Sequence, residues 1–483
     1  MTHSLKKNYL YNVMYQVISI IVPFITTPYI SRVLGADAIG EYSYTASIVT
    51  YFSIAATMGL AMYGQREIAY VRNDRGKRSI LFFEVELYKL LTTTVCVILF
   101  LMFAFRYSSS SRRILYLVQT TTIISVFFDI SWFYQGLEEF RITVFRNLLI
   151  KIIGAISIFV FVHTKDDLLL YVGLHCLIVF VSNAMLWLYL GRYISFPSVR
   201  DLRPFRFTWT MLEMFIPLIA IQVYTVLDKT MIGRITQSAY ENGCYEQTTK
   251  MINMVMALVT SLGTVMLPRM AAVYAEHNDK RFEELATKAF HYVILLACPL
   301  CAGLIAVSAN FVPIFYGPGY DRVIDLLRIY SFVLIIIPLS NIAGYAILMP
   351  MGQHNKGTIA VVTGAFVNFS LNLFLIAIWK SIGAAVATIV AESVVTLIHL
   401  YFVRKKVSLS SIGKYYIRNV LTAAVMGIFV YLIGIELVQV GMKPIVVLLI
   451  QILSGVIFYY VLIAHVVKDE SLRQVLLSLL RRR

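Results

Sequence analysis

Charged residues are scarce in this 483-residue chain: they make up 14% of it, against roughly 25% in a soluble domain, and 59% of residues are hydrophobic. Long polar segments are missing as well. The longest gaps between hydrophobic stretches, near residues 64–79, 191–208, 234–246 and 269–285, hold about 13 to 18 residues, whereas a separate catalytic domain needs about 50 or more. This excludes a sizeable soluble domain and places any function among membrane helices.

The sequence motifs of soluble enzymes are absent too. The chain contains no P-loop, no G-x-S-x-G and no H-E-x-x-H pattern, so nothing indicates ATP hydrolysis or zinc chemistry. We expect a protein that is not an enzyme and has no cofactor. Transport by such a chain would use an ion gradient, of protons or sodium, or the gradient of the substrate itself.

Cysteine is sparse, with five residues, four of which lie inside hydrophobic stretches. Cys298 and Cys301 form a C-x-x-C pattern, but no second Cys or His pair at ligand spacing accompanies it. Metal binding and disulfide formation are therefore not expected. We interpret the cysteines in these stretches as small buried hydrophobic residues.

The chain does contain many long hydrophobic stretches. We identify fourteen of roughly 20 residues, each long enough to cross a bilayer core of about 30 Å as a helix. They predict an all-α integral membrane protein with about 14 transmembrane helices. The predicted spans lie near residues 9–30, 41–63, 80–105, 113–135, 142–162, 168–190, 209–233, 247–268, 286–309, 322–349, 357–379, 382–403, 414–436 and 444–467.

The net charge of +16, from 42 Lys and Arg against 26 Asp and Glu, predicts the topology. Most basic residues fall in alternate loops, which the positive-inside rule assigns to the cytoplasm together with both termini. One predicted outside loop, with Arg106, Arg112 and Arg113, argues against this topology. Basic residues spread over one membrane side favour anionic lipids as a partner, and we expect no binding of nucleic acid.

The N-terminal region is similar to a secretory signal, because Lys6 and Lys7 precede a hydrophobic run. Pro23 and Pro28 interrupt that run, and no small-residue cleavage pattern follows. We therefore expect a first span that is retained.

Two connections between predicted spans have similar sequences. ISRV at 30–33, followed by GEY at 40–42, joins the first two spans, and IGRI at 232–235, followed by GCY at 243–245, joins the seventh and eighth. Many transporters consist of two copies of one bundle with the substrate between them. The match predicts two six-helix lobes related by pseudo-two-fold symmetry, residues 1–207 and 208–406, and an appended helix pair with a basic tail, residues 407–483.

Several charged residues lie inside predicted spans, where a charge costs about 2.5 to 3.5 kcal/mol or more. We expect such residues to face the bundle interior or water. Toward the cytoplasmic side, the alternative is a side chain that reaches the interface or pairs structurally; the residues concerned are Glu84, Glu86, Lys89, Arg146 and Lys151. The others are Asp129, Glu213, Asp228, Lys229, Lys250, His291 and Glu392.

Polar residues also follow single helix faces. In the first span they occur at steps of three and four, which keeps them on one face: Asn12, Gln16, Ser19, Pro23 and Thr27. Looser versions occur in the seventh span, with Glu213, Pro217, Tyr224 and Asp228, and in the eighth, with Glu246, Lys250 and Asn253. Hydrogen bonding between helices is one explanation. We prefer a water-filled, cation-lined cavity between the two halves.

Seven segments occur in an order that is similar to a known family. They are PYISRVLG at 28–35, YGQREIA at 63–69, DISWFYQGLE at 129–138, LDKTMIG at 227–233, VMLPR at 265–269, YGPGY at 316–320 and SIGAA at 381–385. Over nearly its whole length, the chain resembles the polysaccharide repeat-unit flippases of the multidrug/oligosaccharidyl-lipid/polysaccharide exporter superfamily.

The resemblance implies a fold of two six-helix lobes and the movement of undecaprenyl-diphosphate-linked oligosaccharide from the inner to the outer leaflet of a bacterial plasma membrane. The product would serve capsule, O-antigen or cell-wall polysaccharide synthesis, with a polysaccharide polymerase and other assembly proteins as partners. A diphosphate sugar head cannot cross hydrocarbon unaided. Arg and Lys side chains offer it charge-assisted hydrogen bonds, and alternating access would carry it across.

The candidate site residues come from these motifs and from the polar stripes. For the diphosphate they are Arg32, Lys229 and Lys250. The predicted polar contacts of the cavity are Asn12, Gln16 and Asn253, and Arg66 is a predicted cytoplasmic gate residue. The candidates for ion coupling are Asp228, Asp129 and Glu84.

Three other functions remain open. A lipid II flippase would move a related substrate. An ion-coupled multidrug antiporter shares the superfamily fold but would favour an acidic cavity. A membrane polysaccharide polymerase or glycosyltransferase generally needs a substantial outside loop or an acidic nucleotide-sugar motif.

Overall fold

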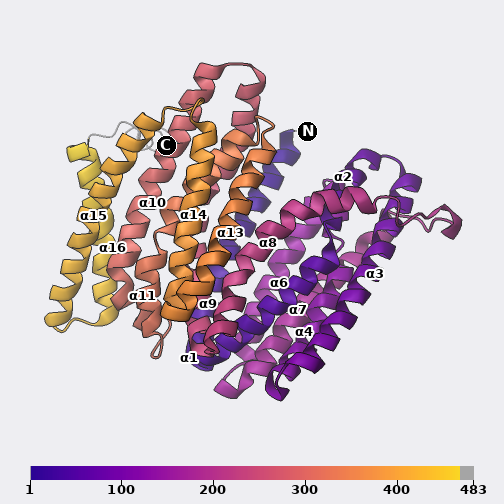
Figure 1. Ribbon diagram of the computed structural model, residues 1–483, viewed down its shortest axis with the longest axis horizontal. Helices are drawn as coiled ribbons and strands as arrows, with labels where there is room; N and C mark the ends of the chain where they lie inside the picture. Colours follow the sequence, from indigo (N-terminus) through magenta and orange to yellow (C-terminus); the bar gives the residue numbers. More distant parts are fainter. Residues whose placement is uncertain (1, 468–483) are drawn as a thin grey trace. The chain divides into compact units, whose positions relative to one another are not determined.

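The computed structural model describes residues 2–467, without the side chains of residues 2–17, 20, 140–141, 145, 199, 212–224, 261–265, 267–268 and 466–467. This part of the chain is helical, with no strand (Figure 1). Its residues fall into two compact units, Met1–Gly243 and Cys244–Arg483. The predicted division into lobes at residues 207 and 406 stays a prediction.

The first unit contains α1 (Thr2–Thr57), α2 (Leu60–Val71), α3 (Arg75–Tyr107), α4 (Ser110–Phe128), α5 (Ser131–Gly136), α6 (Phe140–Phe161), η1 (Lys165–Asp167), α7 (Leu168–Ala184), η2 (Met185–Arg192), η3 (Val199–Asp201) and α8 (Thr208–Thr236). The helix α9 (Ala239–Ala275) begins in the first unit and continues into the second. The second unit then contains α10 (Asp279–Phe315), α11 (Asp321–Tyr330), α12 (Val333–Asn341), η4 (Ile342–Leu348), α13 (His354–Trp379), α14 (Ser381–Val403), α15 (Leu409–Gln439), α16 (Pro444–Val461) and η5 (Leu462–Val467).

Ten helices among the described residues are long and apolar enough to cross a membrane, or eleven if the bent pair Asp321–Tyr330 and Val333–Leu348 counts as one span. The predicted all-α membrane fold is thereby confirmed. The difference from 14 has two sources. One is that Ile21–Val71 forms a single segment of 51 residues where the sequence predicts two spans. The other is that the structure does not describe some side chains of α8 and α9, the helices at the predicted seventh and eighth spans.

The helix α1 bends at Gly35, where the backbone has φ 79° and ψ 171°. Glycine adopts such positive φ values without the steric penalty that a side chain brings. The predicted connection between the first two spans is therefore a sharp kink and not a loop. It divides α1 into two arms, and the helix as a whole packs against α3, α4, α6 and α8.

Two of the family-like segments pack against each other in the core of the first unit. A Cβ atom on Gly64 of α2 would lie 2.4 Å from the ring of Trp132, and one on Gly136 of α5 would lie 2.7 Å from the carbonyl O of Gln65. The two helices can approach this closely because neither glycine has a side chain. These glycines therefore have a packing role.

The connection from η2 to α8, residues 193–207, is bonded along the first half of α3. Arg75 and Arg78 donate to the carbonyl O of Ile194 at 2.9 Å and of Tyr193 at 3.0 Å. Further along, the buried Glu84 accepts the N–H of Arg203 at 2.8 Å and forms an ion pair with Arg206 at 2.6 Å. The same helix begins with a cap, in which the N–H of Lys77 donates to Asp74 and lowers the pKa of that carboxyl group.

In the second unit, α10 packs against α11, α12, α15 and α16, and α14 packs against α11, α12 and α13. Asn310 of α10 donates to Gln451 of α16 at 2.9 Å, and Gln451 donates to the carbonyl O of Val430 in α15 at 3.0 Å. At another level, Tyr459 of α16 donates to the carbonyl O of Leu295 at 3.1 Å. The predicted appended pair is thus joined to α10 by polar bonds at two levels.

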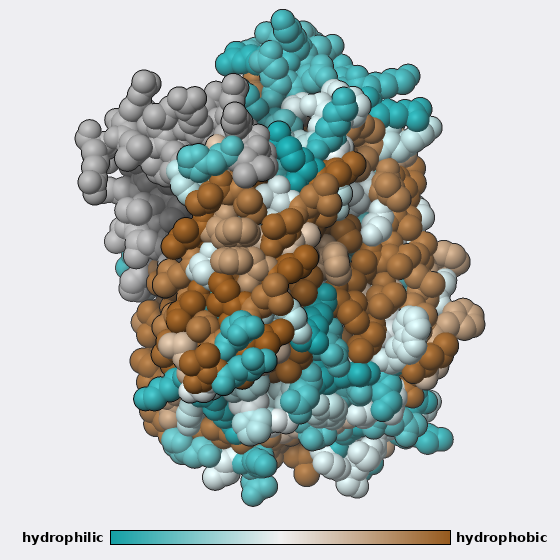
Figure 2. Space-filling model, turned by 90° about the vertical axis from the view of Figure 1, so that its left-hand side faces the viewer, coloured by the Kyte–Doolittle hydropathy of each residue, from teal (hydrophilic) through white to brown (hydrophobic). Residues whose placement is uncertain are grey.

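The outer face of the second unit is hydrophobic in its middle part. Figure 2 shows a broad band of hydrophobic side chains between two hydrophilic margins. Exposed residues of α15 and α16 that contribute to such a surface are Ile417, Leu421, Ile428, Leu453, Val456 and Ile457, each at least 59% exposed. A band of this kind is expected where lipid chains surround a protein.

Candidate functional site

Hydroxyl groups connect the part of α1 that follows Gly35 to the segment LDKTMIG, residues 227–233 of α8. Thr230 donates to Ser47 at 2.8 Å, and its Oγ1 lies 3.0 Å from the hydroxyl of Tyr51. A Cβ atom on Gly233 would lie 2.2 Å from the ring of Tyr44, so the motif glycine lets α8 lie flat against this tyrosine. Asp228 and Lys229 directly precede Thr230 in α8.

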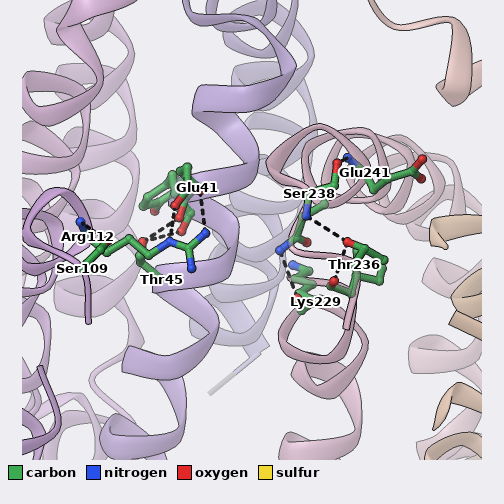
Figure 3. A network of polar contacts seen from close by, with 11 residues as sticks. Glu41, Thr45, Ser109, Arg112, Lys229, Thr236, Ser238 and Glu241 are labelled. Atoms are coloured by element: carbon green, nitrogen blue, oxygen red, sulfur yellow. Dashed lines mark hydrogen bonds and ion pairs between the residues drawn. The ribbon is translucent and has the colours of Figure 1, made fainter. Parts of the chain in front are cut away.

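Glu41 and Arg112, both labelled in Figure 3, form an ion pair next to the ring of Tyr44. Arg112 of α4 donates from Nε and Nη2 to the two carboxylate oxygens of Glu41, each at 2.7 Å, and its guanidinium lies 4.8 Å from the centre of the Tyr44 ring. Bidentate pairs of this kind are among the strongest polar contacts in proteins. Arg112 belongs to the loop that argued against the predicted topology. The predicted topology stays a prediction.

The helices α1 and α9 cross at very short range within the first unit. A Cβ atom on Gly40 would lie 1.7 Å from the carbonyl O of Ala239, and a Cβ atom on Gly243 would lie 1.9 Å from the carbonyl O of Ala36. The contact is reciprocal, since each glycine faces the residue four positions before the other glycine. Only small residues permit such an approach of two helix backbones.

The predicted diphosphate contacts are distributed over both units. Arg32 of α1 is exposed and Lys229 of α8 is part-exposed, both in the first unit, and Asn242 donates to the carbonyl O of Lys229 at 3.0 Å. Lys250 of α9, in the second unit, forms an ion pair with Glu246 at 3.2 Å. The meeting of these three cations at one site stays a prediction.

The other predicted substrate contacts differ in their surroundings. Asn253 of α9 is exposed. Arg66 of α2 forms an ion pair with Glu67 at 2.8 Å and lies 5.7 Å from the centre of the Tyr63 ring. The side chains of Asn12 and Gln16 lie outside the described residues. The roles of these four residues stay predictions.

The three ion-coupling candidates have different surroundings. Asp228 is buried in α8. Asp129 accepts the N–H of Ser131, the first residue of α5, at 3.0 Å. Glu84 holds the connection to α8 through Arg203 and Arg206. The last two carboxylates thus have structural contacts, and coupling by any of the three stays a prediction.

The helix α3 contains a buried ion pair between Glu86 and Lys89. The sequence analysis listed both residues as charges within a span but did not pair them. Lys89 donates to Glu86 at 2.7 Å and to the carbonyl O of Asp129 at 2.9 Å, and both side chains are at most 5% exposed. The carbonyl group belongs to the break between α4 and α5. The pair therefore ties this break to α3, which is the structural alternative that the sequence left open.

Sequence reasoning placed no functional role on two other basic residues, both in α6. Lys151 donates to Ser19 of α1 at 2.5 Å. Arg146 donates to Asn147 at 2.6 and 3.1 Å and to the carbonyl O of Ser182 in α7 at 3.3 Å.

Comparison with known proteins gives one family and several similar folds. A family model described as "Polysaccharide biosynthesis protein" matches residues 5–274. A predicted O-antigen transporter of Escherichia coli (strain K12) is 22% identical over 414 residues, which cover 83% of this chain and 97% of that protein.

Among solved structures, the lipid II flippase MurJ in an inward closed conformation has a TM-score of 0.72 at 16% identity, and the match covers 94% of this chain and 97% of MurJ. An inward-facing multidrug resistance MATE transporter of the MOP superfamily has a TM-score of 0.55 at 14% identity, and the match covers 82% of this chain and 99% of the transporter. These two likenesses concern the fold alone.

Proposed function

The chain belongs to the polysaccharide biosynthesis protein family. From this premise we propose that it is a flippase of the MOP superfamily and that its substrate is an undecaprenyl-diphosphate-linked oligosaccharide. The chain moves this repeat unit from the inner to the outer leaflet of a bacterial plasma membrane by alternating access. Both termini lie in the cytoplasm. A polysaccharide polymerase then uses the product.

The physical requirement is a polar path for a charged head. Removing a diphosphate and its sugars from water without compensating bonds is prohibitively unfavourable. Lysine and arginine supply charge-assisted hydrogen bonds to phosphate oxygens. The observation that carries the proposal is the match of residues 5–274 to a family of polysaccharide biosynthesis proteins, in a chain whose apolar helix Ile142–Phe161 contains the basic residue Lys151.

Internal symmetry supports alternating access. Gly40 and Gly243 are 203 positions apart (243 − 40), and so are Ala36 and Ala239 (239 − 36). These are the residues of the reciprocal crossing between α1 and α9, and the two glycines are equivalent in the sequence repeat. Repeats related by symmetry are the usual basis for rocking of two halves.

We assign roles to the candidate residues on this basis. Arg32, Lys229 and Lys250 bind the diphosphate, with Asn12, Gln16 and Asn253 as polar contacts. Arg66, exposed on α2, meets the anionic head first. Asp228, which is buried in α8, is the first candidate for ion coupling, with Asp129 and Glu84 as the other candidates.

A leaflet assay tests the proposal. The full chain is reconstituted in liposomes with undecaprenyl-diphosphate-linked oligosaccharide, and the outer-leaflet fraction is followed with and without a proton or sodium gradient. We expect redistribution that depends on the protein. An unchanged distribution under every gradient contradicts transport, and faster movement of lipid II than of the oligosaccharide carrier favours the lipid II alternative.

A further inference from the structure

The helix α3 carries an exposed apolar stripe that has the length of a bilayer core. Its members follow one another at steps of three and four, which keeps them on one face, and each is at least 42% exposed: Leu87, Leu91, Val95, Ile98, Met102 and Phe105. The 18 steps of this stripe (105 − 87) correspond to about 27 Å of helix, and a bilayer core is about 30 Å thick. Leu87 therefore marks the level at which the apolar core of the membrane ends.

One turn before Leu87, the connection at residues 193–207 covers the same face of α3. Glu84 lies three positions before Leu87 and thus continues the line of the stripe. It is nevertheless fully buried, and it accepts the N–H of Arg203 at 2.8 Å and pairs with Arg206 at 2.6 Å. The connection therefore lies on the side of α3 that faces lipid one turn further along the helix.

Two ring contacts give the depth of the connection. Phe196 lies 5.5 Å from Phe83, and Phe205 lies 5.8 Å from Tyr88, measured between ring centres. Phe83 and Tyr88 are four residues before and one residue after Leu87, so both contacts lie within about 6 Å of the end of the core along the helix. The headgroup region extends about 5 to 8 Å beyond the core on each side. The connection is therefore at the level of the headgroups.

Large aromatic rings of this region are exposed at that level. Phe196 is 93% exposed and Phe205 is 61% exposed, and Trp209, which follows the connection at the start of α8, is 75% exposed. Rings of this size gain free energy when they leave water for apolar surroundings. Aromatic residues are enriched at the interface between membrane and water for this reason. The three rings match a headgroup layer better than they match water.

Basic side chains accompany these rings. The connection contains three arginines against one acidic residue, Asp201. Arg206 is paired with Glu84, whereas Arg203 bonds to Glu84 through its backbone N–H, and Arg200 and Arg203 are both exposed. Guanidinium groups form charge-assisted hydrogen bonds with phosphate oxygens, and anionic lipids attract basic segments close to the membrane. The charge of the connection is thus complementary to an anionic headgroup.

We propose that the connection at residues 193–207 binds anionic phospholipid, with Phe196 and Phe205 inserted between headgroups and Arg200 and Arg203 on the phosphate oxygens. Its bonds to α3 hold it in a fixed position on that helix. The inference goes beyond the proposed function, because it concerns the outer surface of the first unit and does not depend on which substrate is moved.

The test compares phosphatidylglycerol, which is anionic, with phosphatidylcholine, which has no net charge. Each lipid is titrated into the full chain in detergent while the melting temperature is followed, since a bound lipid raises it. We expect phosphatidylglycerol to stabilise the unmodified chain at the lower concentration. The variant Arg200→Gln, Arg203→Gln should need about ten-fold to thirty-fold more phosphatidylglycerol for the same effect, and Arg200→Lys, Arg203→Lys should stay within a few-fold.

The matched control is Lys165→Gln, Lys443→Gln, which removes two exposed basic residues away from the connection and should bind phosphatidylglycerol normally. Equal stabilisation of the unmodified chain by both lipids contradicts the proposal. So does a glutamine pair that binds like this control, and in either case the proposed function stands. If the glutamine pair does not fold, Arg200→Gln alone decides, and unchanged affinity of that variant removes the site.

A second measurement separates a lipid from a protein partner. Phe196→Trp adds a tryptophan to the connection, and the added fluorescence is recorded in nanodiscs that contain a phospholipid with a nitroxide on its headgroup. We expect strong quenching by this lipid and weak quenching by iodide in the water phase. The reverse result would show that the connection faces water, as a surface for a protein partner would, and it would overturn the proposal.

Discussion

Replacing Gly40 with alanine tests the reciprocal crossing of α1 and α9 directly. The new Cβ atom would lie 1.7 Å from the carbonyl O of Ala239, whereas real Cβ atoms essentially never approach closer than 3.0 Å. The two helix backbones must therefore separate by about 1.3 Å (3.0 − 1.7) at this point. Overpacking of this kind costs about 1 to 3 kcal/mol. We expect a melting temperature several degrees lower and slower transport.

The same geometry predicts strong coupling with the second glycine. A Cβ atom on Gly243 would lie 1.9 Å from the carbonyl O of Ala36 and needs a separation of about 1.1 Å (3.0 − 1.9). One movement of the helices relieves both clashes. The double variant Gly40→Ala, Gly243→Ala should therefore be about as unstable as Gly40→Ala alone, and the two effects should not add.

Thermal unfolding of the purified chain in detergent is the assay. Gly413→Ala is the matched control, because a Cβ atom there meets nothing within 4 Å and so measures only the gain of about 1 kcal/mol that alanine brings to a helix. If Gly40→Ala melts at the same temperature as Gly413→Ala, or if the effects of Gly40→Ala and Gly243→Ala add in full, the crossing is not packed as described.

Three further variants test other contacts. Glu41→Gln should lower the free energy of unfolding by about 1 to 3 kcal/mol, because Arg112 loses its bidentate partner. Additive effects of Glu41→Gln and Arg112→Gln in a double-mutant cycle would contradict a direct pair. Glu84→Gln should loosen the connection at residues 193–207 and speed its cleavage by trypsin. Glu283→Gln, at an exposed position, should leave cleavage unchanged. Equal cleavage rates for the two variants would show that Glu84 does not hold this connection. Gln451→Leu should lower the melting temperature, since Asn310 and the carbonyl O of Val430 both lose a partner, and an unchanged value would show that these bonds do not hold the last two helices.

The membrane-spanning helices of this protein were predictable, because ten of the described helices have the length and composition that a bilayer demands. The connections between helices were less predictable from the sequence. The predicted turn at residues 31–40 is a kink at Gly35 inside one long helix, because a single positive φ value suffices to redirect the chain. Hydropathy detects where apolar segments stop, and it carries no information on how sharply a helix bends.

The charged residues in the spans were predictable in number and not in role. Glu84 and Asp129 were candidates for ion coupling, and the structure surrounds them with Arg206 and the N–H of Ser131. Such partners come from positions far away in sequence or from local caps, and no periodicity in a single chain reveals them.

The most direct test of the central claim is the leaflet assay with a charge-neutral variant, Arg32→Gln, Lys229→Gln, Lys250→Gln. A matched variant neutralises three basic residues that lie outside the proposed path: Lys77, Lys165 and Arg281. We predict that the first variant folds but no longer moves undecaprenyl-diphosphate-linked oligosaccharide between leaflets, while the second moves it at the normal rate. Full activity of the first variant would contradict recognition of the diphosphate by these cations.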